Sequence, residues 1–165
     1  MKDMPAQLPE GLCISAIPER ENPHDVLISK NDRPLSDLPK GARVGTSSLR
    51  RSSQLKHIRP DLVILPLRGN LDTRIRKIEA EKLDAIVLAA AGLRRLNYKD
   101  RISQYLPLEV MLPAVGQGAL CIETRKDDPT VVPVVGTLNH AETKMVVLAE
   151  RAFLHRLEGG CQVPI

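Results

Sequence analysis

Arginines gather at three places where an apolar run gives way to a helical pattern. These places are residues 45–51 (GTSSLRR), 67–74 (LRGNLDTR) and 91–95 (AGLRR). The free N–H groups at a helix start attract anions, and arginine can grip a carboxylate or phosphate with two parallel hydrogen bonds. Because the loops after the strands of an open α/β sheet share one edge, we expect one anion-binding cleft; capped helices with solvated arginines are the alternative. The arginines expected to converge there are Arg50, Arg51, Arg68, Arg74 and Arg95.

The class of anion can be narrowed by what the sequence lacks. Proteins that bind single-stranded nucleic acid combine basic grooves with aromatic side chains, yet the only aromatic residue between positions 43 and 99 is Tyr98. The chain also lacks the G-x-x-x-x-G-K-[ST] and G-x-G-x-x-G motifs that cradle nucleotide phosphates. A ligand with many carboxylates therefore fits best. A basic nucleic-acid-binding domain remains a rival, and it predicts an affinity that falls steeply with salt.

A cysteine near the end of the sequence has a distinctive setting. Cys161 follows Gly159 and Gly160, so little side-chain bulk surrounds its sulfur, and an accessible thiol can serve as a covalent anchor. A tight turn is the simpler alternative. Cys13 and Cys121 lie in apolar runs and are interpreted as small buried hydrophobic residues. The cysteines and histidines show no metal-ligand spacing, so no metal site is expected.

Apolar runs alternate with helical patterns along most of the chain. Strands that are apolar throughout are typical of a sheet covered on both faces, which indicates an α/β fold with mostly parallel sheets. The expected strands are residues 11–17, 25–29, 42–46, 61–67, 84–89 and 120–124. The expected helices are residues 47–58, 70–82, 91–96 and 139–157.

Two of these helices carry specific expectations. Ser47 or Ser48 should cap the first helix. Asn139 should cap the last one, with Glu142 completing a capping box. The side chains expected to line one face of the last helix are Val146, Ala149 and Phe153.

The composition is typical of an intracellular α/β protein. Hydrophobic residues make up 42% of the chain and aromatic residues 2%, so the core must be built from Leu, Ile, Val and Ala. No window approaches the roughly 18 apolar residues that span a bilayer, and the start does not resemble a signal peptide. We therefore expect a soluble, cytoplasmic protein. Both ends of the chain look cut.

Several motifs in register resemble the porphobilinogen deaminase (hydroxymethylbilane synthase) family. They are residues 21–25 (ENPHD), 45–51, 67–70 (LRGN), 114–119 (AVGQGA) and 157–161 (LEGGC). The resemblance covers essentially the whole chain. It implies a transferase that links four porphobilinogen molecules head to tail into hydroxymethylbilane with release of ammonia, in heme and chlorophyll biosynthesis. A non-catalytic anion-binding module of the periplasmic-binding-protein type is the alternative.

The resemblance also implies roles for individual residues. A dipyrromethane cofactor is attached through a thioether to Cys161, and Asp3 matches the catalytic aspartate. Arginines of the family bind the acetate and propionate groups of the pyrroles, so Arg74 and Arg95 are expected to bind substrate. The remaining residues expected to contact the cofactor are Lys2, Ser48, Arg50, Arg51 and Arg68.

The family's three-domain organisation gives further expectations. Residues 1–18 and 119–136 would be remnants of a first domain, residues 24–112 a nearly complete second domain, and residues 139–165 the start of a third, α+β domain. The first two domains resemble periplasmic binding proteins. The expected partners are porphobilinogen and the growing polypyrrole, with no nucleic acid or membrane, and the full-length protein is expected to be a monomer. For a plant or algal source, a plastid location is the alternative to the cytoplasm.

Overall fold

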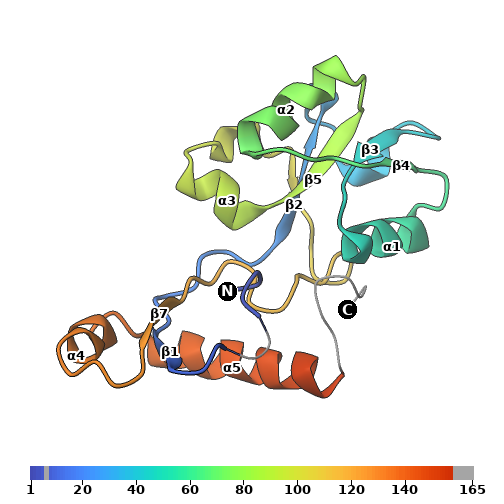
Figure 1. Ribbon diagram of the computed structural model, residues 1–165. Coiled ribbons are helices and arrows are strands. Elements are labelled where there is room, and N and C mark those ends of the chain that lie inside the picture. The colour runs from blue at the N-terminus through green and yellow to red at the C-terminus, as the bar shows by residue number, and fades with distance from the viewer. Residues whose placement is uncertain (6–7, 158–165) are drawn as a thin grey trace. The chain divides into compact units, whose positions relative to one another are not determined.

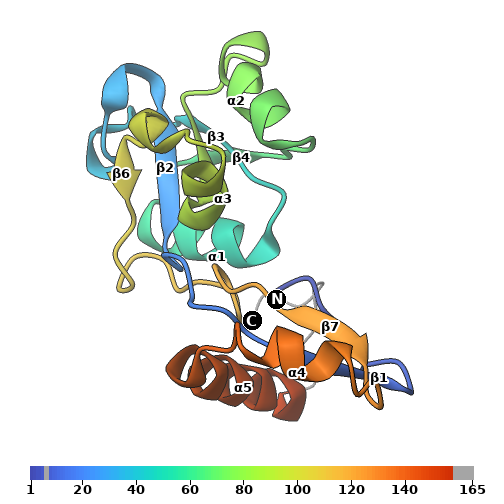
Figure 2. The same cartoon turned by 90° about the vertical axis from the view of Figure 1, so that its left-hand side faces the viewer.

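The computed structural model describes residues 1–5 and 8–157. Their contacts divide the chain into two compact units, which Figure 1 and Figure 2 show from two directions. Unit 1 combines Met1–Pro23 with the described residues from Ala114 onward, and unit 2 is His24–Pro113. The chain therefore passes between the units twice, once after Pro23 and once after Pro113.

Unit 2 is built on a five-stranded sheet with the strand order β4-β3-β5-β2-β6. Strand β3 pairs in parallel with both β4 and β5. Strand β2 pairs in antiparallel orientation with both β5 and β6. The strands are β2 (Asp25–Ser29), β3 (Arg43–Gly45), β4 (Val63–Leu65), β5 (Ala85–Ala89) and β6 (Gln104–Tyr105).

The α/β class is confirmed, but the sheet of unit 2 is mixed rather than mostly parallel. Parallel neighbours need a long crossover connection, and helices α1 (Leu49–Ile58) and α2 (Leu71–Ala80) provide it between β3, β4 and β5. The segment between β2 and β3 contains only two short 3₁₀ turns, η1 (Lys30–Asp32) and η2 (Leu35–Asp37). Without a crossover helix the chain turns back, so β2 runs opposite to β3 and β5.

Both faces of this sheet are covered, as the apolar strands predict. Neighbouring residues on a strand point to opposite faces, so Leu27 and Val26 enter different core clusters. Helix α1 contributes Leu55 to the cluster on one face. Helices α2 and α3 (Ala90–Arg95) contribute Ile78 and Leu93 to the cluster on the other face (Figure 1).

The starts of α1 and α2 follow from the local sequence. Ser48 caps α1, and its hydroxyl oxygen accepts a hydrogen bond from the Arg51 backbone N–H at 3.4 Å. Asn70 caps α2 in the same way through Thr73, at 2.9 Å. Because short polar side chains satisfy the unpaired N–H groups of a first turn, both helices begin where the sequence predicts.

Unit 1 joins segments that are far apart in the sequence. Strand β1 (Leu12–Ala16) pairs in antiparallel orientation with β7 (Ile122–Arg125). Two helices follow, α4 (Val131–Gly136) and α5 (Ala141–Arg156). The small core includes Ile17, Ala119 and, from α5, Val147. Within the described residues, no helix has the length and apolar character that crossing a membrane requires.

Two expectations for α5 are wrong. The N-cap is His140, whose ring Nδ1 accepts from the Thr143 N–H at 3.3 Å, whereas the Asn139 side chain accepts from the Ile17 N–H at 3.1 Å. The predicted face is also wrong: Val146, Ala149 and Phe153 are exposed. One step along a helix turns the side chain by about 100°, and the contacts with Ile17 select the face that carries Val147.

Candidate anion-binding site

The first two arginine-bearing loops are joined at one edge of the unit 2 sheet. The Thr46 N–H donates to the Leu65 carbonyl at 2.9 Å. The Ser47 hydroxyl accepts from the Leu67 N–H at 2.8 Å and donates to the Leu67 carbonyl at 3.1 Å. Ser47 is therefore not the cap of α1 but a link between the two loops. The first turns of α1 and α2 begin at this edge, where helix N-termini favour anions.

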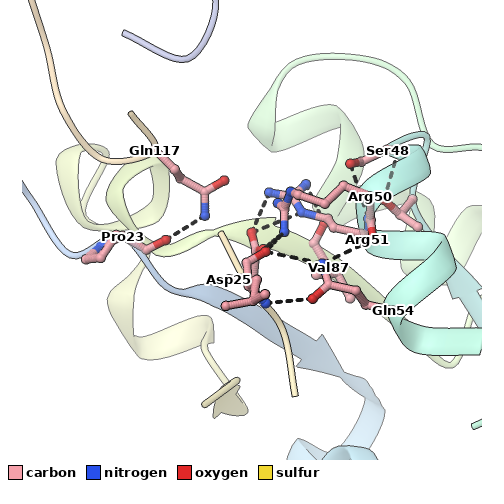
Figure 3. Close-up of polar contacts among 10 residues, drawn as sticks. Pro23, Asp25, Ser48, Arg50, Arg51, Gln54, Val87 and Gln117 are labelled. Atoms are coloured by element: carbon pink, nitrogen blue, oxygen red, sulfur yellow. Dashed lines mark hydrogen bonds and ion pairs between the residues drawn. The ribbon is translucent and has the colours of Figure 1, made fainter. Parts of the chain in front are cut away.

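A buried carboxylate holds the two arginines of the first loop, as Figure 3 shows. Asp25, the first residue of β2, has an exposed fraction of 0%. Its Oδ2 lies 2.8 Å from Arg50 Nη1, and its Oδ1 lies 2.7 Å from Arg51 Nη2 and 3.0 Å from Arg51 Nε. Arg51 also donates to the Val87 carbonyl at 3.2 Å. Buried charges require such pairing because desolvation disfavours an isolated ion.

The electrostatics of this cluster leave it attractive to anions. Burial lowers the pKa of the Arg51 guanidinium, the Asp25 carboxylate opposes that shift, and the positive charges of Arg50 and Arg74 add to it. An arginine nevertheless stays protonated in proteins. Two guanidinium groups against one carboxylate leave one net positive charge beside the helix starts.

Arg50 has a second partner at the end of unit 2. Its Nη1 donates to the Leu112 carbonyl. Gln54, one turn further along α1, fixes the same residue from both sides: its Nε2 donates to the Leu112 carbonyl at 3.2 Å, and its Oε1 accepts from the Leu112 N–H at 2.7 Å. Side chains of α1 therefore bind both Asp25 and Leu112, which lie near the first and the last residue of unit 2 in the sequence.

The other predicted arginines are more open. Arg68 is exposed in the second loop. Arg74, in the first turn of α2, is half-buried and donates through Nε to the Gly69 carbonyl at 2.8 Å. Arg95 is exposed and stands in the last turn of α3, away from the strand end at which that helix begins. Ser48, Arg50 and Arg51 therefore lie together at the start of α1, and Arg74 is close enough for its charge to act on Arg51.

Two other predicted site residues, Lys2 and Asp3, are exposed residues at the start of unit 1. Met1, which precedes them, packs partly against the unit 1 core. Cys161, the expected cofactor anchor, lies outside the described residues, so its role stays a prediction.

Sequence reasoning missed Asp25. The residue opens the run Asp25-Val26-Leu27-Ile28, which is otherwise apolar and which the pattern places in a buried strand. A carboxylate is almost never fully buried without a partner. A carboxylate in a strand that is expected to be buried therefore indicates a buried cationic partner. It does not identify which of the many arginines is that partner.

Sequence reasoning also missed a polar cluster in unit 1. Arg20 forms a two-pronged ion pair with Glu150 of α5, with N–O distances of 2.6 and 3.2 Å. Glu150 also accepts from the Gly116 N–H at 2.7 Å. Gln117 is 1% exposed, and its Nε2 donates to the Pro23 carbonyl at 2.6 Å. No local pattern signals these contacts, because Arg20 and Glu150 are 130 positions apart.

The fold defines the class of protein to which the chain is similar. A Bacillus subtilis lipoprotein with a proposed role in methionine binding matches 82% of this chain and 64% of its own, at 14% identity and a TM-score of 0.51. An R. palustris protein solved with adipate matches 89% of this chain and 67% of its own, at 13% identity and a TM-score of 0.50. The fold is thus that of periplasmic-binding-protein-like α/β domains.

The sequence defines the family within that class. Residues 1–133 match the family model "Porphobilinogen deaminase, dipyromethane cofactor binding domain", and residues 144–165 match "Porphobilinogen deaminase, C-terminal domain". The chain therefore belongs to the porphobilinogen deaminase family. Porphobilinogen deaminases from Brevibacillus brevis and Geobacillus kaustophilus are 59% and 60% identical to it across the whole chain. The chain spans about half the length of these relatives, 53% and 54%.

Proposed function

We propose that this chain is the substrate-binding part of a porphobilinogen deaminase, or hydroxymethylbilane synthase. Such a transferase joins four porphobilinogen molecules head to tail into hydroxymethylbilane and releases ammonia, in tetrapyrrole biosynthesis. The observation that carries the proposal is the net positive cluster of Arg50 and Arg51 around Asp25, at the start of α1. Each pyrrole unit of the substrate carries an acetate and a propionate, and guanidinium groups at a helix start suit these carboxylates.

The residues of unit 2 fit a dipyrromethane cofactor. The group carries several carboxylates, and Ser48, Arg50, Arg51 and Arg68 offer hydroxyl and guanidinium donors around one sheet edge. Arg74 and Arg95 would bind the carboxylates of incoming and added substrate units. When bound to Cys161, the cofactor supplies the pyrrole to which the first substrate unit is joined. We propose these contacts on the chemistry of the donor set.

Asp3 of unit 1 would act on the reacting pyrrole. Joining pyrroles develops positive charge on a ring nitrogen, and a fixed carboxylate such as Asp3 lowers the energy of that charge. The same group could hold the proton that the leaving amine takes up. Lys2 would contact a carboxylate of the cofactor. The exposure of Asp3 and Lys2 in unit 1 supports this role, since both side chains are accessible.

The proposal extends to organisation and location. Residues 1–18 and 119–136 would belong to a first domain, 24–112 to a second and 139–165 to a third. We propose that the full-length protein acts in the cytoplasm as a monomer on porphobilinogen and the growing polypyrrole, without nucleic acid or membrane.

The proposal is tested by the intact mass of the purified chain after incubation with porphobilinogen. We expect a mass increase of one dipyrromethane that is absent in Cys161→Ser and retained in the matched control Cys13→Ser. An adduct that persists in Cys161→Ser would contradict the anchor. A folded chain that keeps its bare mass would contradict the proposal that this chain builds the cofactor site.

A further inference from the structure

We propose that Asp25 is a positioning residue that preorganises Arg50 and Arg51 for the carboxylates of the ligand, an inference that rests on the proposed function. Asp25 has no exposed surface, so it acts through the arginines. Its backbone is held on both sides within the sheet: it is paired with Ala89 of β5, and its carbonyl accepts from the Leu106 N–H at 2.9 Å. The carboxylate therefore sits on a rigid support.

The two carboxylate oxygens divide the arginines between them. Oδ1 accepts from both Nε and Nη2 of Arg51, which fixes the plane of that guanidinium, and the Val87 carbonyl fixes its third nitrogen. Oδ2 faces Arg50 Nη1. Arginine loses considerable rotamer entropy when it is immobilised, and donors that are already ordered bind more tightly because that loss precedes binding.

A second support acts on Arg50 from the other side. The Leu112 carbonyl, which accepts from Arg50, also accepts from Gln54 Nε2, and the Leu112 N–H donates to Gln54 Oε1. Gln54 also donates to the Arg50 carbonyl at 3.2 Å. Arg50 thus lies between a buried carboxylate and a braced carbonyl. Gln54 is a secondary positioning residue, and because it carries no charge, we expect its loss to have a smaller effect than the loss of Asp25.

Titration of the full chain with two carboxylate probes, porphobilinogen and citrate, tests this inference. Asp25→Asn keeps the size of the side chain, removes its charge and raises the net positive charge of the cluster. We nevertheless expect both affinities to fall about tenfold or more, because the two guanidinium groups are no longer ordered before binding. Gln54→Met should lower them by about threefold, the effect of one neutral hydrogen bond. Ser53→Ala, at an exposed position of the same helix, should leave them unchanged. Affinities refer to folded protein, so lost stability alone does not produce the expected change.

Arginine side-chain NMR of the parent chain gives a second readout that needs no folded variant. We expect restricted rotation of the guanidinium groups of Arg50 and Arg51 and slow exchange of the Arg51 Nε–H. Freely rotating guanidinium groups would overturn the inference, as would a folded Asp25→Asn variant with unchanged affinity for both probes. A parent chain that binds neither probe would count against the proposed function, while the arginine signals would still decide whether Asp25 orders the pair.

Discussion

The two loops at the sheet edge of unit 2 carry similar arginines in opposite environments. Arg50 and Arg51 of the first loop are 8% and 7% exposed and share a buried carboxylate. Arg68 of the second loop is exposed, and Arg74 bonds to a backbone carbonyl. The difference shows that a shared pattern of strand, turn and arginine does not set how an arginine is used. The use of each arginine depends on its neighbours in the folded sheet. Asp25 of β2 lies against Arg50 and Arg51 at the start of α1 and buries them.

The largest effect should separate the buried arginine from the exposed one. Arg51→Met should lower the free energy of unfolding by about 3 kcal/mol, because it removes a partner from a carboxylate that stays buried. Arg68→Met should change it by no more than about 0.5 kcal/mol, as is usual for an exposed side chain. Urea unfolding of the two variants measures both values. Equal losses would show that Arg51 contributes no more to the stability of the fold than Arg68.

The second loop should depend on its glycine. Gly69 has φ +120°, and a Cβ at this position would lie 2.7 Å from Thr73 Cγ2. Gly69→Ala should therefore lower the free energy of unfolding by about 1–3 kcal/mol. Gly92→Ala is the matched control, because Gly92 is helical and a Cβ there meets nothing within 4 Å. A thermal melt in which both variants match the parent would contradict the strain assigned to the turn.

The helix caps of the two loops should differ in strength. Ser48→Ala and Asn70→Ala should each lower the free energy of unfolding by about 1 kcal/mol. The Asn70 variant should lose more, because its cap bond is 2.9 Å long whereas that of Ser48 is 3.4 Å. Chemical denaturation ranks the pair. The reverse order would mean that Ser48 contributes through contacts other than its cap.

The smallest effect concerns an ion pair on the surface. The Arg59 guanidinium, which bonds to both oxygens of Asp61, holds the pKa of that carboxyl well below its ordinary value. The stabilisation is present above the ordinary aspartate pKa, near 4, and is lost as pH falls through the lowered one. The urea midpoint of Asp61→Asn should therefore fall less between pH 4 and pH 2 than that of the parent. Asp100→Asn, at an exposed position, should retain the parent's slope.

Arg59 also supports a neighbouring loop. It donates to the Leu35 carbonyl at 2.8 Å and the Leu38 carbonyl at 3.1 Å besides binding Asp61. These carbonyls belong to a loop rich in proline. Proline has no N–H, so such a loop has few backbone donors of its own, and a long side chain supplies them.

Much of unit 2 could be predicted because its signals are local. Apolar runs gave its main strands, and Ser48 and Asn70 marked helix starts through bonds that span three residues. The direction of β2 could not be predicted in this way, because strand pairing depends on segments distant in the chain. The prediction for the face of α5 was wrong for the same reason, because packing against Ile17, which is far away in the sequence, buries Val147.

The amino-acid sequence by itself determined the family, the alternation of strands and helices, and the set of arginines at the strand ends. Each of these features depends on residues that are close together in the sequence, so it can be recognised without the folded structure. Only the tertiary structure decided that Asp25 joins Arg50 and Arg51 and that Arg20 reaches Glu150. An ion pair becomes specific when burial removes water as the competing partner, and burial is a property of the folded chain.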